Sequence, residues 1–221
     1  MTHSDHNVER ASKIDTATLS DALDKLGIAG QCLNIKPLQH VFRLTGRAFT
    51  LSYGPVTGKG GTVGDYIDDL PAGAVVVIDN QGRENATVWG DILTMCAHRR
   101  GVAGTVIDGA CRDTHLALEL NYPIFSRSYS MRTGKDRVQL NSVEVPVKIG
   151  DASVAPGNIL RGDSDGVLSI PRAEESAVLD LAETIQKAEE RIRQAVLNGQ
   201  RLDEARRQQG YHLLQRREQG R

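Results

Sequence analysis

Two short segments of the chain combine residue types that suit the binding of a small anion beside a cation. In residues 88–93 and 106–113, an apolar run leads to a glycine and an acid, and a predicted helix follows. The start of a helix presents unpaired N–H groups and the positive end of the helix dipole, which favour an anion. Arg112 offers a cationic fork that matches a carboxylate, and Asp113 is a hard oxygen ligand for a divalent cation. Together the segments predict a site for a small carboxylate with a metal.

Each segment alone also has an ordinary structural interpretation. Asp91 could simply cap a helix, and Arg112 with Asp113 could form a surface pair at a helix start, where Asp is favoured. Both segments are nevertheless expected to follow buried parallel strands, whose carboxyl ends form the usual ligand-binding edge of an α/β sheet. Their combination therefore favours a binding site.

Other polar residues carry weaker signals. His115 has no partner at metal-ligand spacing, so a position on a helix surface is favoured. Cys111 has no evident base nearby in sequence and is expected to be a small buried thiol. The glycines of residues 58–61 lack the spacing of a phosphate-binding loop, and residues 162–166 are expected to form a hairpin turn instead of a calcium loop.

Composition limits the classes of protein to which the chain can belong. Its 221 residues carry a formal net charge of −1, which fits one domain with an appended arm and gives no basic footprint for nucleic acid. No run of about 18 apolar residues predicts a membrane helix, and the polar first residues do not resemble a signal peptide. The three cysteines form no CxxC pair. We therefore expect a cytoplasmic protein with no nucleic-acid or membrane partner.

Hydrophobic periodicity predicts the elements that would position the site. Helices are predicted over residues 8–26, 91–100, 113–120 and 173–197, and strands over residues 41–52, 74–78, 104–107 and 122–125. Asp15 or Thr16 could cap a second helix within residues 8–26. Alternating strands and helices imply right-handed crossovers and a parallel core. Residues 138–171 have the pattern of antiparallel hairpins. We expect residues 1–171 to form an α/β catalytic body and residues 172–221 a helix and arm that packs on a neighbouring subunit.

Five segments, in this order and spacing, give the chain a resemblance to a known family. They are residues 89–93, 101–113, 123–125, 154–157 and 163–171. The sequence resembles the 4-hydroxy-4-methyl-2-oxoglutarate/4-carboxy-4-hydroxy-2-oxoadipate aldolase family, whose superfamily includes the regulator of ribonuclease activity A. The likeness runs from roughly Asp15 to Gly199. It implies an α/β fold, an α-β-β-α sandwich resembling the swivelling phosphohistidine domain with a C-terminal helical arm, assembled into trimers or hexamers.

The resemblance also implies a metal and an arginine in the site. The family is that of divalent-metal-dependent (class II) pyruvate aldolases, in which the acid corresponding to Asp113 binds Mg²⁺ or Mn²⁺. Arg112 would contact the pyruvyl group. A glutamate from the C-terminal helix of a neighbouring subunit would complete the site, and counting back from Gly199 favours Glu189, with Glu190 as the alternative.

The glycine turn would hold the substrate carboxylate. The resemblance implies that the turn formed by Gly90, Asp91, Ile92 and Leu93 gives its amides to pyruvate. Asp91 would also hold a catalytic water. This water, helped by Glu189, would remove the proton of the C4 hydroxyl.

The expected reaction follows from this implied site. A 4-hydroxy-2-oxo acid would be cleaved to pyruvate and a second carbonyl product, and oxaloacetate would be decarboxylated through the same enolate. The competing hypothesis is a non-enzymatic regulator that binds a ribonuclease, because the superfamily contains such proteins. The long helix with Glu189 favours the enzyme. Residues 126–134 differ from the loop that commonly follows this strand in the family. Loops such as residues 127–137, together with the partner subunit, are expected to form the pocket walls beyond pyruvate, so the sequence does not name the physiological substrate.

Overall fold

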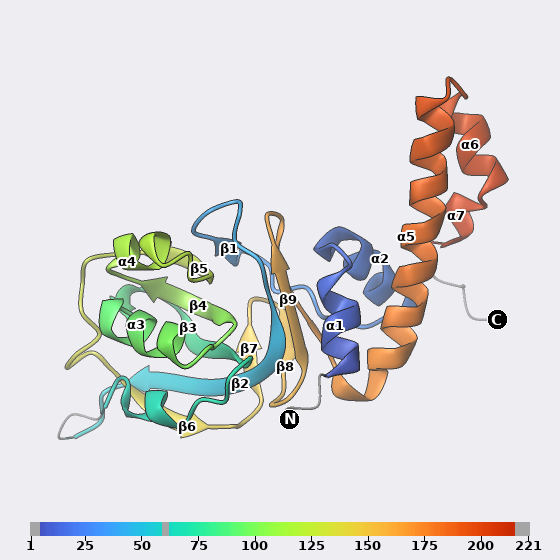
Figure 1. Cartoon of the computed structure of the whole chain (residues 1–221). Coiled ribbons are helices and arrows are strands. Elements are labelled where there is room, and N and C mark those ends of the chain that lie inside the picture. Colours follow the sequence, from blue (N-terminus) through green and yellow to red (C-terminus); the bar gives the residue numbers. More distant parts are fainter. Residues whose placement is uncertain (1–4, 59–61, 215–221) are drawn as a thin grey trace.

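The fold has four layers, in the order helix, sheet, sheet and helix (Figure 1). The computed structural model describes residues 5–58 and 62–214. One apolar cluster lies between the first sheet and the helices of residues 91–99 and 114–119, and a second lies between the two sheets. A third lies between the second sheet and the helices of residues 6–12, 16–26 and 175–197. This arrangement confirms the predicted α-β-β-α sandwich.

The first sheet is parallel at its centre. Its order is β1-β5-β4-β3-β2, and β6 pairs with β2 on the far edge. The strands are β1 (Lys36–Pro37), β2 (Leu44–Pro55), β3 (Val75–Thr87), β4 (Gly104–Cys111), β5 (Ile124–Tyr129) and β6 (Val138–Val143). The pairs β2–β3, β3–β4 and β4–β5 are all parallel, as the alternation of strands and helices predicted. A 3-10 turn (Asp65–Asp69) precedes β3, and helices α3 (Asp91–Arg99) and α4 (Thr114–Glu119) follow β3 and β4.

Strand β3 begins as a continuous apolar run because both of its faces are buried. Val76 and Ile78 belong to the cluster under α3 and α4, whereas Val75 and Val77 face the second sheet. Burying each such side chain stabilises the fold by about 1.5–3 kcal/mol. The predicted strands over 74–78 and 104–107 covered only these apolar runs. The strands continue to Thr87 and Cys111, through irregular pairing that the polar sequence did not indicate.

The second sheet shares strand β2 with the first. The start of β2 pairs with β9 (Ile159–Asp163), its middle pairs with β3, and β10 (Gly166–Ile170) lies beside β9. A separate hairpin, β7 (Val147–Ile149) and β8 (Ala152–Val154), packs into the cluster between the sheets. The hairpins predicted within residues 138–171 are therefore confirmed.

Helices α1 (His6–Ser12), α2 (Thr16–Leu26) and α5 (Glu175–Leu197) cover the outer face of β9 and β10. The helical stretch predicted over residues 8–26 consists of two helices, because Asp15 adopts an extended conformation and caps α2 through the amide of Thr18, at 2.7 Å. A short 3-10 turn (Arg172–Glu174) precedes α5, so the predicted helix start at residue 173 was two residues early.

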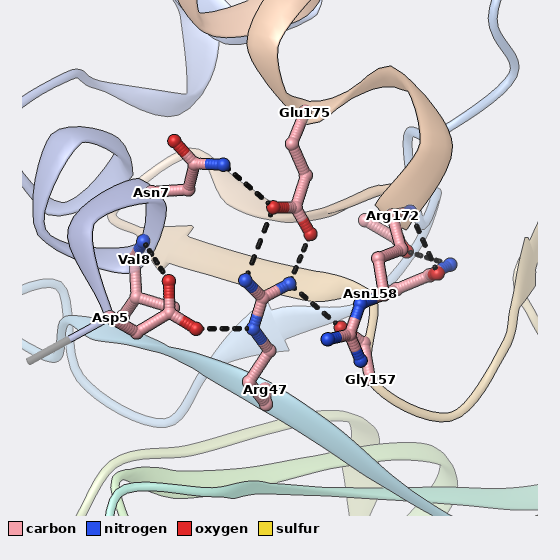
Figure 2. Close-up of polar contacts among 9 residues, drawn as sticks. Asp5, Asn7, Val8, Arg47, Gly157, Asn158, Arg172 and Glu175 are labelled. Carbon is pink, nitrogen blue, oxygen red and sulfur yellow. Dashed lines mark hydrogen bonds and ion pairs between the residues drawn. The ribbon is translucent and has the colours of Figure 1, made fainter. Parts of the chain in front are cut away.

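Arg47 clamps these helices to the sheet (Figure 2). Its guanidinium binds the carboxylate of Glu175 at the start of α5, with one contact of 3.1 Å and a second that is shorter. It also donates to Asp5 at 2.7 Å and to the carbonyl of Gly157 at 2.9 Å, while Asn7 donates to Glu175 at 2.9 Å. One side chain of β2 thus joins the α1 region, the loop before β9 and the start of α5.

The far half of α5 projects beyond the sheets and carries α6 (Leu202–Gln208) and α7 (Tyr211–Leu214) (Figure 1). Gly199 ends the long helix with a φ of +89°, a conformation that glycine adopts readily. The helical part of the predicted arm is present, and residues 215–221 lie outside the described residues. No described helix is both long and apolar enough to cross a membrane. The division at residue 171 stays a prediction.

Candidate functional site

A pocket of about 460 Å³ lies where β3 and β4 lead into α3 and α4. Five residues predicted for the site line it, namely Gly90, Asp91, Ile92, Leu93 and Arg112. The two segments meet because the chain after β3 pairs with the end of β4. The amide of Val88 donates to Ala110, and that of Arg112 donates to Trp89. The carboxyl ends of the neighbouring strands therefore place both helix starts together, as the sequence predicted.

Gly90 is the point at which the two helix starts touch. A Cβ at this position would lie 2.8 Å from Oδ2 of Asp113 and 3.4 Å from Nε of Arg112. Its φ of −147° is open to any residue, so the glycine is required for room and not for backbone conformation. Asp113, although it is not among the pocket-lining residues, is thereby in contact range of the glycine turn.

The first turn of α3 offers amides to the pocket, but one of them is already engaged. The amide of Ile92 donates to Oδ1 of Asp91 at 2.8 Å. No acceptor among the described residues binds the amide of Leu93. Trp89 holds the turn in place, because its indole donates to Thr94 at 2.9 Å and its ring stacks on Tyr122. Of the amides of Ile92 and Leu93, which were predicted to bind the carboxylate, only that of Leu93 is therefore unoccupied within the described residues.

Asp113 has a conformation that leaves its carboxylate available. It occupies the cap position of α4 with a φ of +53°, in the left-handed region, and makes no capping hydrogen bond. Such a conformation costs most non-glycine residues of order 1 kcal/mol, although aspartate adopts it more readily than most. The carboxylate instead lies 3.2 Å from Nε of Arg112, and the two side chains are 33% and 39% exposed. This pair faces solvent and retains room for a ligand.

The donor set at Asp113 fits a magnesium-like ion. Among residues 5–58 and 62–214, no cluster of three or more His, Cys, Asp or Glu side chains could hold a metal. A closed site of the zinc type is therefore not built within one described chain. Mg²⁺ commonly binds through one or two carboxylates and takes its remaining oxygens from water and substrate, so a single accessible carboxylate is compatible with it.

The loop after β5, predicted to form a pocket wall, contributes three residues to the lining of the pocket. Thr133, Gly134 and Lys135 line it together with Thr87. Thr87 binds the carbonyl of Arg132 through both its amide, at 3.3 Å, and its hydroxyl, at 2.9 Å. The predicted role of residues 127–137 as a pocket wall agrees with this placement, but only the tertiary contact with Thr87 singles out residues 133–135.

Glu189 and Glu190 do not reach the pocket of their own chain. They lie on the projecting half of α5, on the side of the molecule away from α3 and α4 (Figure 1). Glu189 accepts a hydrogen bond from Tyr211 at 3.3 Å and lies 3.8 Å from Arg193, with its side chain 21% exposed. Glu190 is 55% exposed and pairs with Arg193. Neither glutamate lines the pocket of its own chain, and the supply of one by a neighbouring subunit stays a prediction.

Two neighbouring residues behave as their sequence context predicted. Burial raises the pKa of the Cys111 thiol to about 11, which leaves it protonated and a poor nucleophile near neutral pH. His115 is exposed on α4. Neither adds a nucleophile or a metal ligand to the pocket.

Comparison with known proteins agrees with this architecture. A family model described as "RraA-like: Aldolase/RraA" matches residues 16–169. The chain belongs to this family. Protein DlpA of Legionella pneumophila is 40% identical over 195 residues, which are 87% of this chain but 32% of that protein, so the chain spans about a third of its length. A Halalkalibacterium halodurans protein, provisionally named 4-hydroxy-4-methyl-2-oxoglutarate aldolase, is 33% identical over 83% of this chain and 85% of its own.

A solved structure from the same family has the same fold. Streptomyces coelicolor RraAS2, described as an unusual member of the RNase ES inhibitor RraA protein family, superposes with a TM-score of 0.79 and 25% identity. The match covers 85% of this chain and 96% of RraAS2. The resemblance deduced from the sequence is therefore confirmed. The Aldolase/RraA family contains relatives named as aldolases and relatives named as ribonuclease inhibitors, so function has to be argued from the pocket.

Proposed function

We propose that this Aldolase/RraA protein is a lyase of the class II pyruvate aldolase type, which cleaves a 4-hydroxy-2-oxo acid to pyruvate and a second carbonyl compound. The observation that carries the proposal is the contact of Gly90 with the partly exposed Arg112–Asp113 pair at one end of a pocket. The names of aldolase relatives support the same class of reaction.

Asp113 would hold a divalent ion, Mg²⁺ or Mn²⁺, because its carboxylate is neither buried nor used as a helix cap. When bound, the ion would supply a Lewis acid beside the 2-oxo group of the substrate. Arg112 would add a fixed positive charge where negative charge develops, and the free amide of Leu93 would bind the substrate carboxylate. Because the amide of Ile92 already binds Asp91, we assign it the smaller part in carboxylate binding.

The bond changes follow from these positions. Removal of the C4 hydroxyl proton allows the C3–C4 bond to break, so that C4 leaves as a carbonyl and the electron pair passes to the pyruvate enolate. Protonation at C3 then gives pyruvate. Asp91 would position the water that takes the hydroxyl proton, because only its Oδ1 has a partner among the described residues. Loss of CO₂ from oxaloacetate gives the same enolate, so decarboxylation is an expected second activity.

We further propose that the site is shared between subunits of a trimer or hexamer. Glu189 does not line the pocket of its own chain, and its helix, α5, projects beyond the sheets, where it could reach a neighbour (Figure 1). Glu190 remains the alternative for this role. Size measurement in solution, followed by mixing of Asp113→Ala with Glu189→Gln protein, tests the idea, because two inactive variants would regain part of the activity only if subunits complement each other.

A lactate dehydrogenase-coupled assay tests the reaction itself. The protein is supplied with oxaloacetate or a panel of branched and sugar-derived 4-hydroxy-2-oxo acids, first with Mg²⁺ and then after chelation. We expect pyruvate release that chelation abolishes and Mg²⁺ restores. Full activity after exhaustive chelation would contradict the metal-dependent mechanism.

The second candidate function is a non-enzymatic regulator that binds a ribonuclease, and the similarity to RraAS2 favours it. A ribonuclease inhibition assay on the same preparation separates the two proposals. Inhibition with no pyruvate from any 2-oxo acid would favour the regulator.

A further inference from the structure

A buried threonine of α3, Thr94, is hydrogen-bonded to the glycine turn of the pocket. The indole of Trp89 donates to the hydroxyl oxygen of Thr94 at 2.9 Å, and the same hydroxyl donates to the carbonyl of Gly90 at 2.9 Å. Both side chains are almost fully buried. Because an indole N–H can only donate, the proton of the hydroxyl is left for the carbonyl of Gly90. The two hydrogen bonds therefore have one direction, from Trp89 through Thr94 to Gly90.

Both ends of this hydrogen-bond chain are fixed. The ring of Trp89 stacks on that of Tyr122, with 6.3 Å between the ring centroids and 3° between the planes, so the indole N–H keeps its direction. The carbonyl of Gly90 accepts a second hydrogen bond, from the amide of Thr94 at 3.0 Å. Because a peptide group is planar, this carbonyl also sets the direction of the amide that follows it, at the start of α3.

The hydrogen-bond chain connects the two halves of the pocket. Gly90 begins the turn that lines the pocket as far as Leu93, and the carbonyl of Trp89 accepts the amide of Arg112 at 2.9 Å. Trp89, Gly90 and Arg112 all line the pocket, whereas Thr94 does not. Any effect of Thr94 on a bound ligand must therefore pass through the residues that it holds.

We propose that Thr94 is a positioning residue of the pocket, whose hydroxyl holds the Gly90–Leu93 turn in the orientation that binds a carboxylate. The inference rests on the proposed function, in which this turn binds the carboxylate of a 2-oxo acid. That carboxylate is unchanged between the bound substrate and the transition state, so its binding contributes equally to both. Loss of the Thr94 hydroxyl should therefore raise KM and leave kcat nearly unchanged.

The substitution Thr94→Val tests this role, because it keeps the size of the side chain and removes the hydroxyl. Calorimetric titration with Mg²⁺ present measures the affinity for pyruvate and for pyruvamide, which keeps the keto group but has no carboxylate. We expect Thr94→Val to bind pyruvate about tenfold more weakly than wild type, the effect of one hydrogen bond, and to bind pyruvamide as wild type does. Thr94→Ser, which restores the hydroxyl, should recover most of the affinity for pyruvate.

The indole N–H of Trp89 supplies a second readout. Trp89 is the only tryptophan of the chain, so the protein has a single indole resonance in a proton–nitrogen correlation spectrum. Pyruvate should shift this resonance in wild-type protein, because Trp89 lines the pocket. Thr94→Val should move the resonance before any ligand is added, and Thr94→Ser should return it toward the wild-type position.

Thr50→Val is the matched control for loss of a buried hydroxyl. Thr50 is fully buried on β2, its hydroxyl donates to the carbonyl of Val145 at 2.6 Å, and it does not line the pocket. We expect this variant to lose stability in urea denaturation but to keep the wild-type affinity for pyruvate. An equal loss of affinity in Thr50→Val, or wild-type affinity in Thr94→Val, would overturn the positioning role.

The binding measurements separate this inference from the aldolase proposal, because pyruvate binds without any bond being cleaved. If Thr94→Val weakens the binding of pyruvate but no substrate is cleaved, the aldolase proposal fails and the role of Thr94 stands. If a substrate is cleaved to pyruvate while Thr94→Val keeps the wild-type KM and affinity, the role of Thr94 fails alone. If wild-type protein binds no pyruvate, both fail.

Discussion

Two arginine–carboxylate pairs in this protein have the same chemistry but opposite surroundings. In the clamp of Figure 2, the side chain of Glu175 is 7% exposed, and the donors of Arg47 are spent on two carboxylates and a carbonyl. Hydrogen bonding to Glu175 raises the pKa of Arg47. In the pocket, Arg112 and Asp113 are both at least one-third exposed and share one contact of 3.2 Å. The guanidinium of Arg47 is therefore engaged by several acceptors of the body, whereas the pocket pair shares a single contact.

The difference comes from the local backbone. Glu175 lies at the start of α5, packed between α1 and β2, so both of its oxygens meet donors of the body. Asp113 is turned by its left-handed conformation away from the amides of α4 that an aspartate at this position normally binds. An ion pair that is buried and fully hydrogen-bonded holds parts of the fold together, whereas an exposed pair at a helix start can still bind a ligand.

The largest expected effect is on catalysis, from loss of the pocket pair. Asp113→Ala and Arg112→Ala should each lower the rate of pyruvate release by about 10²–10³-fold, because each removes one electrostatic contributor to the enolate. The free energy of unfolding should change little, since the pair is exposed. His115→Ala is the matched control on the same helix and should keep its activity. Near-normal turnover in Asp113→Ala would contradict the claim that the pocket pair, unlike the clamp, acts in the reaction.

The clamp should show the reverse pattern. Glu175→Gln removes the buried charge that faces Arg47, and we expect it to lower the free energy of unfolding by about 3 kcal/mol. Urea denaturation measures this change. The kcat of the protein that remains folded should stay within about twofold of wild type, because the clamp lies outside the pocket. A variant that is stable but inactive would show that the clamp acts on the site.

The smallest expected effect is the pH dependence of the clamp. Hydrogen bonding to Arg47 lowers the pKa of Asp5 below its usual value, which burial opposes only in part. Its contribution to stability is therefore fully present above about pH 4, the ordinary value for an aspartate, and is lost as the pH falls through the lowered folded-state pKa. Thermal unfolding of wild type and Asp5→Asn from pH 7 to 2 should show a difference of less than about 1 kcal/mol that disappears in acid. A difference that persists in acid would assign the effect to packing.

The sequence predicts the pocket pair better than it predicts the clamp. Buried strands ending before Asp91 and Asp113 bring two helix starts to one edge of the sheet, and this rule needs only local patterns. Arg47 and Glu175 are 128 residues apart and follow no motif, so their contact emerges only when α5 packs on the body. Strand β2 itself was predicted, over residues 41–52, but its pairing with strands of both sheets was not, because β9 lies far away in the sequence.

Within the pocket, the sequence identified residue types but not their detailed placement. The left-handed conformation of Asp113 and the bond between Asp91 and Ile92 depend on backbone angles that composition does not encode. Nothing in the sequence distinguishes Lys135 from an ordinary exposed loop lysine. It lines the pocket in a loop that Thr87 holds through the carbonyl of Arg132. The supply of Glu189 by another subunit, and the roles assigned to the pocket residues, stay predictions.

The account is tested most directly by the binding of Mn²⁺, followed by electron paramagnetic resonance as the ion is titrated into metal-free protein. Wild-type protein should bind Mn²⁺, and pyruvate should tighten the binding. Asp113→Asn, which keeps the size of the side chain, should weaken the binding by more than roughly tenfold, whereas His115→Ala should not change it. Equal binding of Mn²⁺ by wild type and Asp113→Asn would contradict the central claim that the exposed pair, unlike the clamp, is a metal and substrate site.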